Sequence, residues 1–253
     1  MLIPRLFKSL WRLPVRAWRV LRSLGLMARV TKRSPGARIV VEDARLPVTI
    51  EVGAGASFEL CGRLTFAAWL GSRQPIFIKI GDGGSLIVGG DFNLGPGCRI
   101  IVEPGAELHI GGRKHESASG ITERTLIMVR RRLSIGTDLL CAWGVFITDS
   151  DWHETTGATS TMDTVIGDHV WLAPNCSILK GSKIGNGCIV ATSTVTHKAS
   201  YPERCLLGGV PARVLAKGRQ WSRDLKPLIN LEGQVVALPP VEVGVPQSQK
   251  HSA

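Results

Sequence analysis

A six-residue period runs through the second half of the chain and restricts the folds available to it. Large aliphatic residues occupy every sixth position without a break, at Ile166, Leu172, Ile178, Ile184 and Val190. A small or medium residue follows four positions after each, at Val170, Cys176, Ser182, Cys188 and Thr194. Six is neither the period of an amphipathic helix nor the alternation of a half-buried strand. It is typical of a chain that forms a short strand, turns a corner and repeats, with the large residue pointing inward.

A looser form of the repeat precedes the strict one. Ile135, Cys141 and Ile147 lie six residues apart. Before them, three segments share an aliphatic residue, a glycine turn, two aliphatic residues two apart and a glycine: 52–62, 80–90 and 102–112. The starts of these segments are unevenly spaced, so the repeat contains insertions. The 29 glycines fit many tight turns better than many helices.

Positive charge is concentrated at the start of the chain. Residues 1–33 contain nine of the 31 Lys and Arg residues and none of the 20 Asp and Glu residues, whereas basic and acidic residues nearly balance in the rest of the chain. The net charge of +11 therefore describes one segment, and the nearly neutral body argues against a nucleic-acid-binding protein. The basic residues recur at spacings of three and four, which predicts a helix over about residues 5–30 with one basic face: Arg5, Lys8, Arg12, Arg16, Arg19 and Arg22.

Trp11, Val15 and Trp18 follow the same period on another face, and Pro14 would start or kink a helix there. A basic stripe with tryptophans is typical of a helix that lies in a membrane interface, so residues 1–33 are expected to contact an anionic membrane. An amphipathic helix packed on its own domain or on a neighbouring subunit explains the pattern equally well. Both interpretations stay open.

Cysteine usage and hydropathy indicate a cytoplasmic protein. No two of the six cysteines have C-x-x-C spacing, and the chain is too long for a small disulfide framework. Basic residues interrupt every apolar run after Met1, so no secretory signal is expected. The longest uncharged apolar stretch, Leu139–Thr148, is too short to cross a bilayer. We expect a cytoplasmic location, extended to the inner face of the membrane if the basic segment binds there.

The hexads resemble those of a known family. Five consecutive hexads from Ile166 to Val195, followed by Gly208–Val214 (GGVPARV), closely resemble the hexapeptide-repeat acyltransferases, which include maltose, galactoside and serine O-acetyltransferases and acetyltransferases of polysaccharide assembly. The strong match runs from Ile135 to Lys217, and the looser repeats extend it back to Arg38. The resemblance implies an all-β fold, a left-handed parallel β-helix with three hexads per triangular coil. It also implies a homotrimer with active sites between subunits.

This interpretation divides the chain into three parts. Residues 1–36 are expected to form the basic amphipathic helical segment, and residues 37–217 the β-helix domain. Residues 218–253 are expected to form a short helix, over about Gln220–Leu231, and an extended or disordered tail.

One interruption of the hexads lies between Ile147 and Ile166. These residues are 19 apart, one coil of 18 plus one extra residue, and Asp149–Asp163 lacks inward aliphatic residues. We expect a loop or bulge there, and loops on a stiff scaffold often carry the chemistry. In the resembling enzymes a histidine in such a loop, often followed by Glu, takes the proton of the attacking hydroxyl. The segment Asp151–Glu154 (DWHE) matches that place, which implies that His153 is the general base and that the hydroxyl attacks acyl-CoA directly.

Residues around His153 are candidates for binding the acceptor. Asp149 and Asp151 could orient the imidazole or accept hydrogen bonds from sugar hydroxyls, because residues two apart on an extended segment point the same way. Alternatively, they could cap a turn through side-chain to backbone hydrogen bonds. Trp152 and Glu154 complete the predicted substrate-binding set.

The resemblance also implies a site for acetyl-CoA. By position, Trp171, Ala173, Pro174 and Thr192 correspond to residues that line the pantetheine groove. Lys198 and Arg213 correspond to cations at the nucleotide end, and Lys217 is a further candidate for binding phosphate. The family often has Thr-Lys where this chain has His197-Lys198, a slight departure from the family pattern.

No metal site is expected. A zinc site needs three or four converging ligands, whereas His109 and His115 are six residues apart, on different sides of a coil, and no histidine pair repeats at the 18-residue step. The cysteines at or near inward positions are explained as small buried hydrophobic residues.

The residues and the resemblance together predict an acetyl-CoA-dependent O-acyltransferase that acts on a sugar hydroxyl of a polysaccharide or lipid-linked glycan precursor. An amino-sugar N-acetyltransferase stays open, because its amine nucleophile would also use a base. A non-catalytic trimeric β-helix scaffold stays open as well, because a fold does not fix a function.

Overall fold

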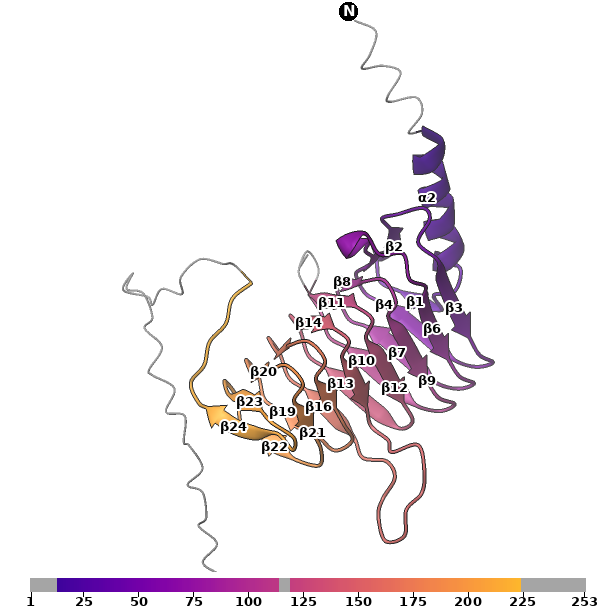
Figure 1. Ribbon diagram of the computed structural model, residues 1–253. Coiled ribbons are helices and arrows are strands. Elements are labelled where there is room, and N and C mark those ends of the chain that lie inside the picture. The colour runs from indigo at the N-terminus through magenta and orange to yellow at the C-terminus, as the bar shows by residue number, and fades with distance from the viewer. Residues whose placement is uncertain (1–12, 114–118, 224–253) are drawn as a thin grey trace, which may run out of the picture. The chain divides into compact units, whose positions relative to one another are not determined.

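The chain winds through three sheets of short strands, which it visits in turn (Figure 1). The computed structural model describes residues 13–113 and 119–223. The first sheet contains, in order, β1 (Lys32–Arg33), β4 (Ser57–Leu60), β7 (Ser85–Val88), β10 (Glu107–Ile110), β13 (Arg132–Ile135), β16 (Thr164–Ile166), β19 (Lys183–Ile184) and β22 (Ser200–Tyr201). The second contains β2 (Arg38–Val41), β5 (Arg63–Phe66), β8 (Phe92–Leu94), β11 (Gly120–Glu123), β14 (Leu140–Trp143), β17 (Trp171–Leu172), β20 (Ile189–Val190), β23 (Leu206–Gly208) and β24 (Arg213–Ala216). The third contains β3 (Val48–Val52), β6 (Ile76–Ile80), β9 (Arg99–Val102), β12 (Leu126–Val129), β15 (Phe146–Thr148), β18 (Ser177–Ile178) and β21 (Val195–Thr196).

Strands of one sheet are three places apart in the chain and pair in parallel up to β23. In the strict hexads the paired residue lies three hexads further on, as for Ile166 with Ile184 and Trp171 with Ile189. One coil therefore takes three hexads, one for each sheet. The structure confirms the predicted all-β, left-handed parallel β-helix with a helical N-terminal segment.

The looser repeats stack as the sequence predicts. Val52 lies in register with Ile80, and Ile80 with Val102, although these two steps along the chain differ in length. Phe58 and Leu86 are aligned in the same way in the neighbouring sheet. The extra residues are therefore accommodated between strands, and the inward positions stay aligned.

The inward positions form one apolar core inside the coil. The five large hexad residues are at most 2% exposed, and the residues four positions after each are fully buried. Ser182 is one of them, and its hydroxyl lies 2.6 Å from Leu179 O and 2.9 Å from Thr196 Oγ1. Its burial is therefore compensated by hydrogen bonds. Each aliphatic side chain in this ladder contributes about 1.5–3 kcal/mol by its burial.

The corners of the coil repeat with the same period as the core. A left-handed backbone conformation recurs every six residues, at His169 (φ 52°), Asn175 (58°), Gly181 (70°), Gly187 (68°) and Ser193 (57°). Glycine and asparagine tolerate this conformation better than other residues, which explains their frequency in the hexads.

The interruption between Ile147 and Ile166 is larger than the residue count indicates. Ile135 pairs with Ile166, and Ile147 pairs with Ile178. Both steps exceed a regular coil by more than two hexads, so the loop adds this length to the corner between β15 and β16. The prediction of one coil plus one extra residue is wrong, because Ile147 and Ile166 are consecutive inward positions. The prediction that Asp149–Asp163 leaves the coil is confirmed.

The coil has a different element at each end. Helix α2 (Leu13–Met27) contacts β2 in the first coil, with Pro14 in the first turn, where proline is tolerated. A turn of 3-10 helix, η1 (Trp69–Gly71), lies between β5 and β6. At the last coil, β24 pairs antiparallel with β23. In the described part of the chain, no helix has the length and apolar character needed to cross a bilayer.

Part of the predicted organisation falls on residues that are not described. Residues from Trp221 onward form a second unit, of which Trp221–Arg223 are described. Most of the helix predicted over Gln220–Leu231, and the tail after it, lie outside the described residues. The same holds for Arg5, Lys8, Trp11 and Arg12. The division at residues 36 and 217 stays a prediction.

Candidate active site

The loop Asp149–Asp163 projects from the corner between β15 and β16 (Figure 1). Its limbs are joined by two antiparallel bridges, which pair Ser150 with Thr161 and Thr155 with Ala158. The loop is therefore a small hairpin mounted on the coil, and residues near its base have fixed surroundings.

Asp149 anchors the start of this hairpin to the preceding coil. Its side chain is fully buried. Its carboxylate accepts hydrogen bonds from the backbone N–H groups of Arg130 (2.8 Å), Arg131 (2.7 Å) and Arg132 (2.7 Å), in the turn between β12 and β13. Asp149 therefore takes the turn-capping role, one of the two alternatives from the sequence. Its predicted contact with the acceptor stays a prediction.

Trp152 fixes the backbone next to His153. It has a left-handed conformation (φ 66°), and its backbone N–H donates to Ser150 Oγ (3.0 Å). Its indole Nε1–H donates to the hydroxyl of Thr148 (3.1 Å), which is buried at the end of β15. The indole is thereby tied to the rigid coil, and its predicted contact with the acceptor stays a prediction.

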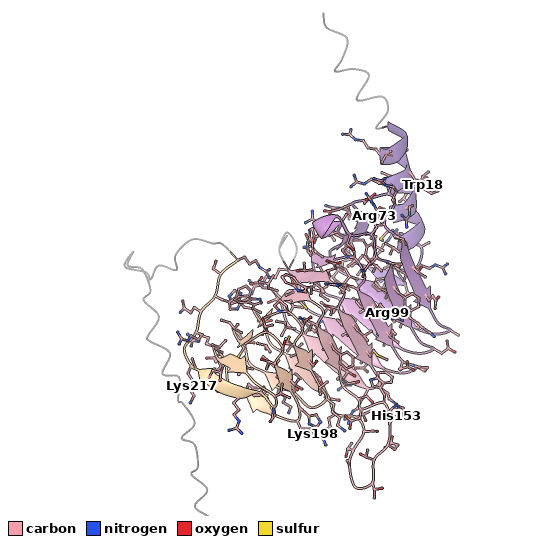
Figure 2. The ribbon with its side chains drawn as sticks, in the orientation of Figure 1. Trp18, Arg73, Arg99, His153, Lys198 and Lys217 are labelled. Atoms are coloured by element: carbon pink, nitrogen blue, oxygen red, sulfur yellow. The ribbon has the colours of Figure 1, made fainter. Side chains whose placement is uncertain are left out.

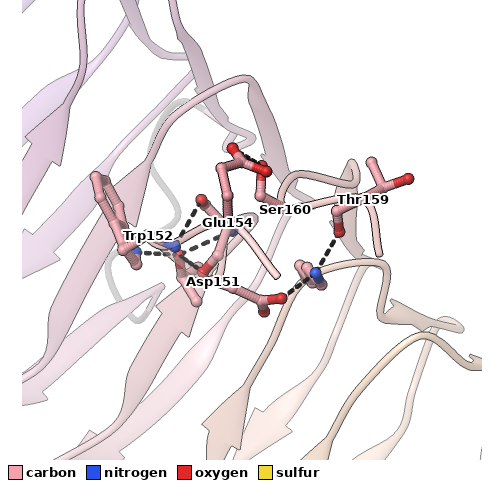
Figure 3. A network of polar contacts seen from close by, with 8 residues as sticks. Asp151, Trp152, Glu154, Thr159 and Ser160 are labelled. Carbon is pink, nitrogen blue, oxygen red and sulfur yellow. Dashed lines mark hydrogen bonds and ion pairs between the residues drawn. The ribbon is translucent and has the colours of Figure 1, made fainter. Parts of the chain in front are cut away.

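Lys180 ties both limbs of the hairpin to the coil through Asp151 and Thr159, which Figure 3 labels. Its ammonium group donates to the carboxylate of Asp151 on the outgoing limb and to the carbonyl oxygen of Thr159 on the returning limb. The Lys180 side chain is 0% exposed, whereas that of Asp151 is 38% exposed. A buried ammonium needs such partners, because an unpaired buried charge is costly. Asp151 therefore holds the loop in place as well as being a predicted acceptor ligand.

Lys180 is missing from the residues selected from the sequence. It is the third residue of its hexad, and the equivalent residues of the next two hexads, Asn186 and Thr192, are not buried. The pattern alone would therefore leave Lys180 in solvent. Its burial results from the hairpin that folds over it. The available signal was a lysine one coil beyond a loop that contains three aspartates.

His153 is exposed on this hairpin (Figure 2). Within the described part of the chain, its imidazole has no hydrogen-bond partner. Glu154, the next residue, is exposed and accepts a hydrogen bond from Ser160 Oγ (2.7 Å) across the hairpin. An accessible imidazole on an ordered backbone is suited to accepting a proton from a bound hydroxyl.

The residues predicted to line the acyl-CoA groove lie at another corner. Trp171 is half-buried on β17, while Ala173 (6% exposed) and the half-buried Pro174 start the corner that leads to β18. Thr192 is exposed at the same corner one coil later, where the N–H of Ser193 donates to Pro174 O (3.1 Å). These residues form a continuous strip along one edge of the coil.

The three predicted phosphate-binding cations are exposed but do not form one group. Arg213 begins β24, which extends the sheet that contains β17. Lys198 lies at the corner of the hairpin, where its backbone N–H donates to Lys180 O (3.0 Å). Lys217 follows β24 and lies apart from Lys198 and His153 (Figure 2).

The predicted residues therefore occupy two corners of the coil. His153 and Lys198 belong to the corner between the third and first sheets, and the strip that contains Trp171 to the corner between the second and third. A strand of the third sheet separates these corners in every coil. Within one chain, the candidate base and the candidate groove do not converge.

The buried thiols are not suited to forming an acyl-enzyme. Burial raises the pKa of Cys98 and of Cys176 to about 12. Burial also raises the pKa of Cys141 well above its ordinary value. Since the thiolate is the nucleophilic form, these cysteines act as packing residues.

His169 Nδ1 lies 2.5 Å from Asp138 Oδ2, and His115 lies outside the described residues. Among the residues that the structure describes, no group of three or more His, Cys, Asp and Glu side chains is placed to hold a metal ion.

Comparison with known proteins adds to this geometry. Residues 163–198 match the family model described as bacterial transferase hexapeptide (six repeats). A protein of Escherichia coli (strain K12) named as a lipopolysaccharide biosynthesis O-acetyl transferase, WbbJ, is 30% identical over 159 residues, which are 57% of this chain and 77% of that protein. YvoF of Bacillus subtilis (strain 168), named as an acetyltransferase, is 30% identical over 102 residues, which are 40% of this chain and 56% of that protein. The crystal structure of the polySia-specific acetyltransferase NeuO has a TM-score of 0.46 at 22% identity and covers 71% of this chain and 84% of its own.

Proposed function

This chain belongs to the bacterial hexapeptide-repeat acetyltransferases, and we propose that it transfers an acetyl group from acetyl-CoA to a sugar hydroxyl of a polysaccharide or lipid-linked glycan precursor. One observation carries the proposal: an exposed histidine on an ordered hairpin that interrupts one corner of the coil. The relative named for O-acetyl transfer in lipopolysaccharide biosynthesis supports a glycan acceptor.

In the proposed reaction His153 acts as the general base. The acceptor hydroxyl attacks the thioester carbonyl carbon while the imidazole takes its proton, so a C–O bond forms as the oxyanion develops. The C–S bond then breaks, and the protonated imidazole returns the proton to the departing sulfur, which leaves as CoA thiol. A positioned base of this kind contributes about 10²–10⁴-fold to the rate.

The hairpin supports this role by limiting where His153 can move. Trp152 is bonded to Thr148 immediately before it, and Asp151 is bonded to Lys180 one residue earlier. Both partners belong to the coil. Small displacements of a catalytic group are costly to the rate, so these contacts favour a fixed base.

The separation of the two corners supports a site shared between subunits. We propose a homotrimer in which the hairpin of one subunit meets the strip of Trp171, Ala173, Pro174 and Thr192 of the next. Lys198, Arg213 and Lys217 remain the proposed contacts for the CoA phosphates. In a closed ring of three copies, each interface brings one hairpin to one groove.

Acceptor-dependent release of CoA thiol from acetyl-CoA tests the proposed activity. Glycan acceptors are offered to the intact protein, to His153→Ala and to His109→Ala, whose histidine is exposed on β10 away from the hairpin. We expect His153→Ala to lose at least about 100-fold in kcat and His109→Ala to keep its rate. Equal rates for the two variants would exclude His153 as the base.

The shared site is tested by mixing two inactive variants. His153→Ala removes the base and Thr192→Trp obstructs the groove, so each homotrimer is inactive. In a mixed trimer, an intact base from one chain can meet an intact groove from the next, and random mixing restores about one quarter of the sites. Mixtures without activity would place base and groove in the same chain.

The same assay separates the alternatives. Cleavage of the product by mild alkali identifies an ester, whereas a stable product identifies an amide and thus an amino-sugar N-acetyltransferase. No acceptor-dependent thiol release across a broad panel would favour a non-catalytic scaffold. A cytoplasmic location is part of the proposal and is supported by the six cysteines, which are all free.

A further inference from the structure

Helix α2 directs arginines toward the coil. Arg19 Nε donates to Val41 O (3.0 Å), and Arg22 Nη1 donates to Ala44 O (2.6 Å). Both carbonyl groups belong to the first coil, where no earlier strand of the second sheet covers β2. Arg19 and Arg22 therefore share the packing face of α2 with Leu26 and Met27, which pack against the core.

The opposite side of α2 is apolar and exposed. Trp18 (57% exposed; Figure 2), Leu21 (59%) and Leu24 (61%) recur at a spacing of three, and Val20 (58%) precedes Leu24 by four residues. Among the described residues, half of the exposed large hydrophobic side chains lie on this helix of 15 residues. Trp18, Val20, Leu21 and Leu24 form this apolar face, and each is more than half exposed.

A groove beside the helix continues the apolar face. It lies between α2 and β2 and has a volume of about 490 Å³. Its lining includes the apolar side chains of Val20, Leu24, Met27 and Ile39. Two exposed arginines, Arg16 and Arg38, also line it. Apolar side chains with guanidinium groups beside them suit an anionic amphiphile, whose hydrocarbon part would contact the apolar side chains and whose negative charge would contact the arginines.

Cations also flank the helix. Arg29, Lys32 and Arg33 follow it and are exposed, and in the described part of the chain none of them pairs with an acidic side chain. Residues 1–12 add three basic residues and no acidic one in the sequence. The face therefore combines exposed Trp and Leu residues with a basic border, as in helices that lie in a membrane interface.

We propose that this end of the protein docks on an anionic lipid bilayer, with Trp18, Leu21 and Leu24 inserted and the bordering arginines and lysines on lipid phosphates. Charge favours this occupant over a second copy of the chain. Two copies meeting through this face would bring two segments together that each hold nine cations and no acid. An anionic surface instead attracts each of these cations.

The docking has a consequence for the acceptor, which rests on the proposed function. The strands β3 and β15 belong to the first and fifth coils, four strand spacings apart, or about 19 Å along the coil axis. A protein held by α2 would therefore keep His153 close to the membrane. This distance suits the glycan part of a lipid-linked saccharide.

Vesicle binding by the full-length chain tests the proposal. The probes are vesicles of phosphatidylcholine and phosphatidylglycerol in a two-to-one mixture, and vesicles of phosphatidylcholine alone, in a sedimentation assay. The variant Leu21→Ser/Leu24→Ser removes two inserted side chains, and Val165→Ser/Val210→Ser removes two exposed aliphatic side chains elsewhere. We expect strong binding to the anionic vesicles only. The α2 variant should bind them at least about tenfold more weakly, and the control should bind like the unchanged protein.

The outcomes are distinct from those of the acetyl-transfer assay. His153→Ala should bind vesicles like the unchanged protein, so docking is measured without turnover. Absence of binding to anionic vesicles, or equal binding by the α2 variant, would overturn the proposal. A change of oligomeric state in the α2 variant with unchanged vesicle binding would identify the face as a subunit interface, and would also overturn it.

Discussion

The pair formed by Asp151 and Lys180 predicts an asymmetric response to mutation. Asp151→Ala leaves the ammonium group, whose side chain is 0% exposed, with only the carbonyl oxygen of Thr159. Removing one partner of a buried pair costs about 3–5 kcal/mol. The lower value applies here, because Asp151 is 38% exposed and water screens the pair. Lys180→Met leaves a carboxylate that water can reach, and methionine fills the vacated volume, so a loss of about 1 kcal/mol is expected.

The cost should appear as opening of the hairpin, because water reaches Lys180 once the loop lifts. About 3 kcal/mol raises the open population by about 100-fold. Hydrogen exchange at two backbone amides reports the opening of the hairpin. The amide of position 151 donates to Ser160 O, and the amide of Met162 donates to Asp149 O. Exchange in the coil should stay unchanged. If His153 is the base, as proposed, it moves with the loop, so kcat should fall further than the KM for acetyl-CoA changes.

The double variant Asp151→Ala/Lys180→Met provides the decisive comparison. With no charge left to hydrate, the hairpin should open less often than in Asp151→Ala alone, so the second substitution is a partial rescue. The reasoning is refuted if the double variant exchanges faster than Asp151→Ala, or if both single variants open the loop equally. Either result would mean that burial of Lys180 does not determine the stability of the loop.

Two further predictions concern buried groups. Asp149→Asn should lower the free energy of unfolding by about 3 kcal/mol in urea titrations at fixed protomer concentration, because the amide turns an NH₂ group toward backbone N–H donors; an unchanged midpoint would contradict the anchoring role. In the native protein one thiol, Cys61, should react readily with a disulfide reagent at pH 8–9. Cys98 and Cys176 should react only after denaturation, because a pKa raised to about 12 keeps them protonated throughout that range; rapid reaction of more than one thiol would contradict this.

The hexad period predicts what repeats, namely the inward residues and the order of the coil. Ile166 and Ile184 are buried and in register because the same steric demand applies in every coil. The size of the interruption is not predictable in this way. The step from Ile147 to Ile166 fits one coil plus one extra residue, and it fits one hexad plus a long insertion equally well. Only the pairing of Ile147 with Ile178 distinguishes them.

The candidate site shows a second limit of the pattern. The sequence places His153 in the loop and Asp149 beside it, but the burial of Lys180 depends on a hairpin that crosses it from another coil. Helix α2 shows the same limit. Its period predicts a basic and an apolar face, but not that Arg19 would bind an edge carbonyl group and leave the apolar face outside. Both features arise from contacts between segments, which a linear pattern does not contain.

An insertion longer than two hexads is compatible with a regular coil because the strands on either side keep their register. Closing a loop of this length costs about 2 kcal/mol in entropy. The charged side chains at its base offset that cost, since a hydrogen bond to a charged group contributes about 1.5–3 kcal/mol and Asp149 alone accepts three. The stability of the fold therefore depends on the inward hexad residues and on the anchored start of the loop. The tip of the loop, from Thr155 to Ala158, takes part in neither. His153 lies between the anchored start of the loop and its tip, and it is exposed. Changes at the tip should therefore leave the burial of the inward hexads undisturbed.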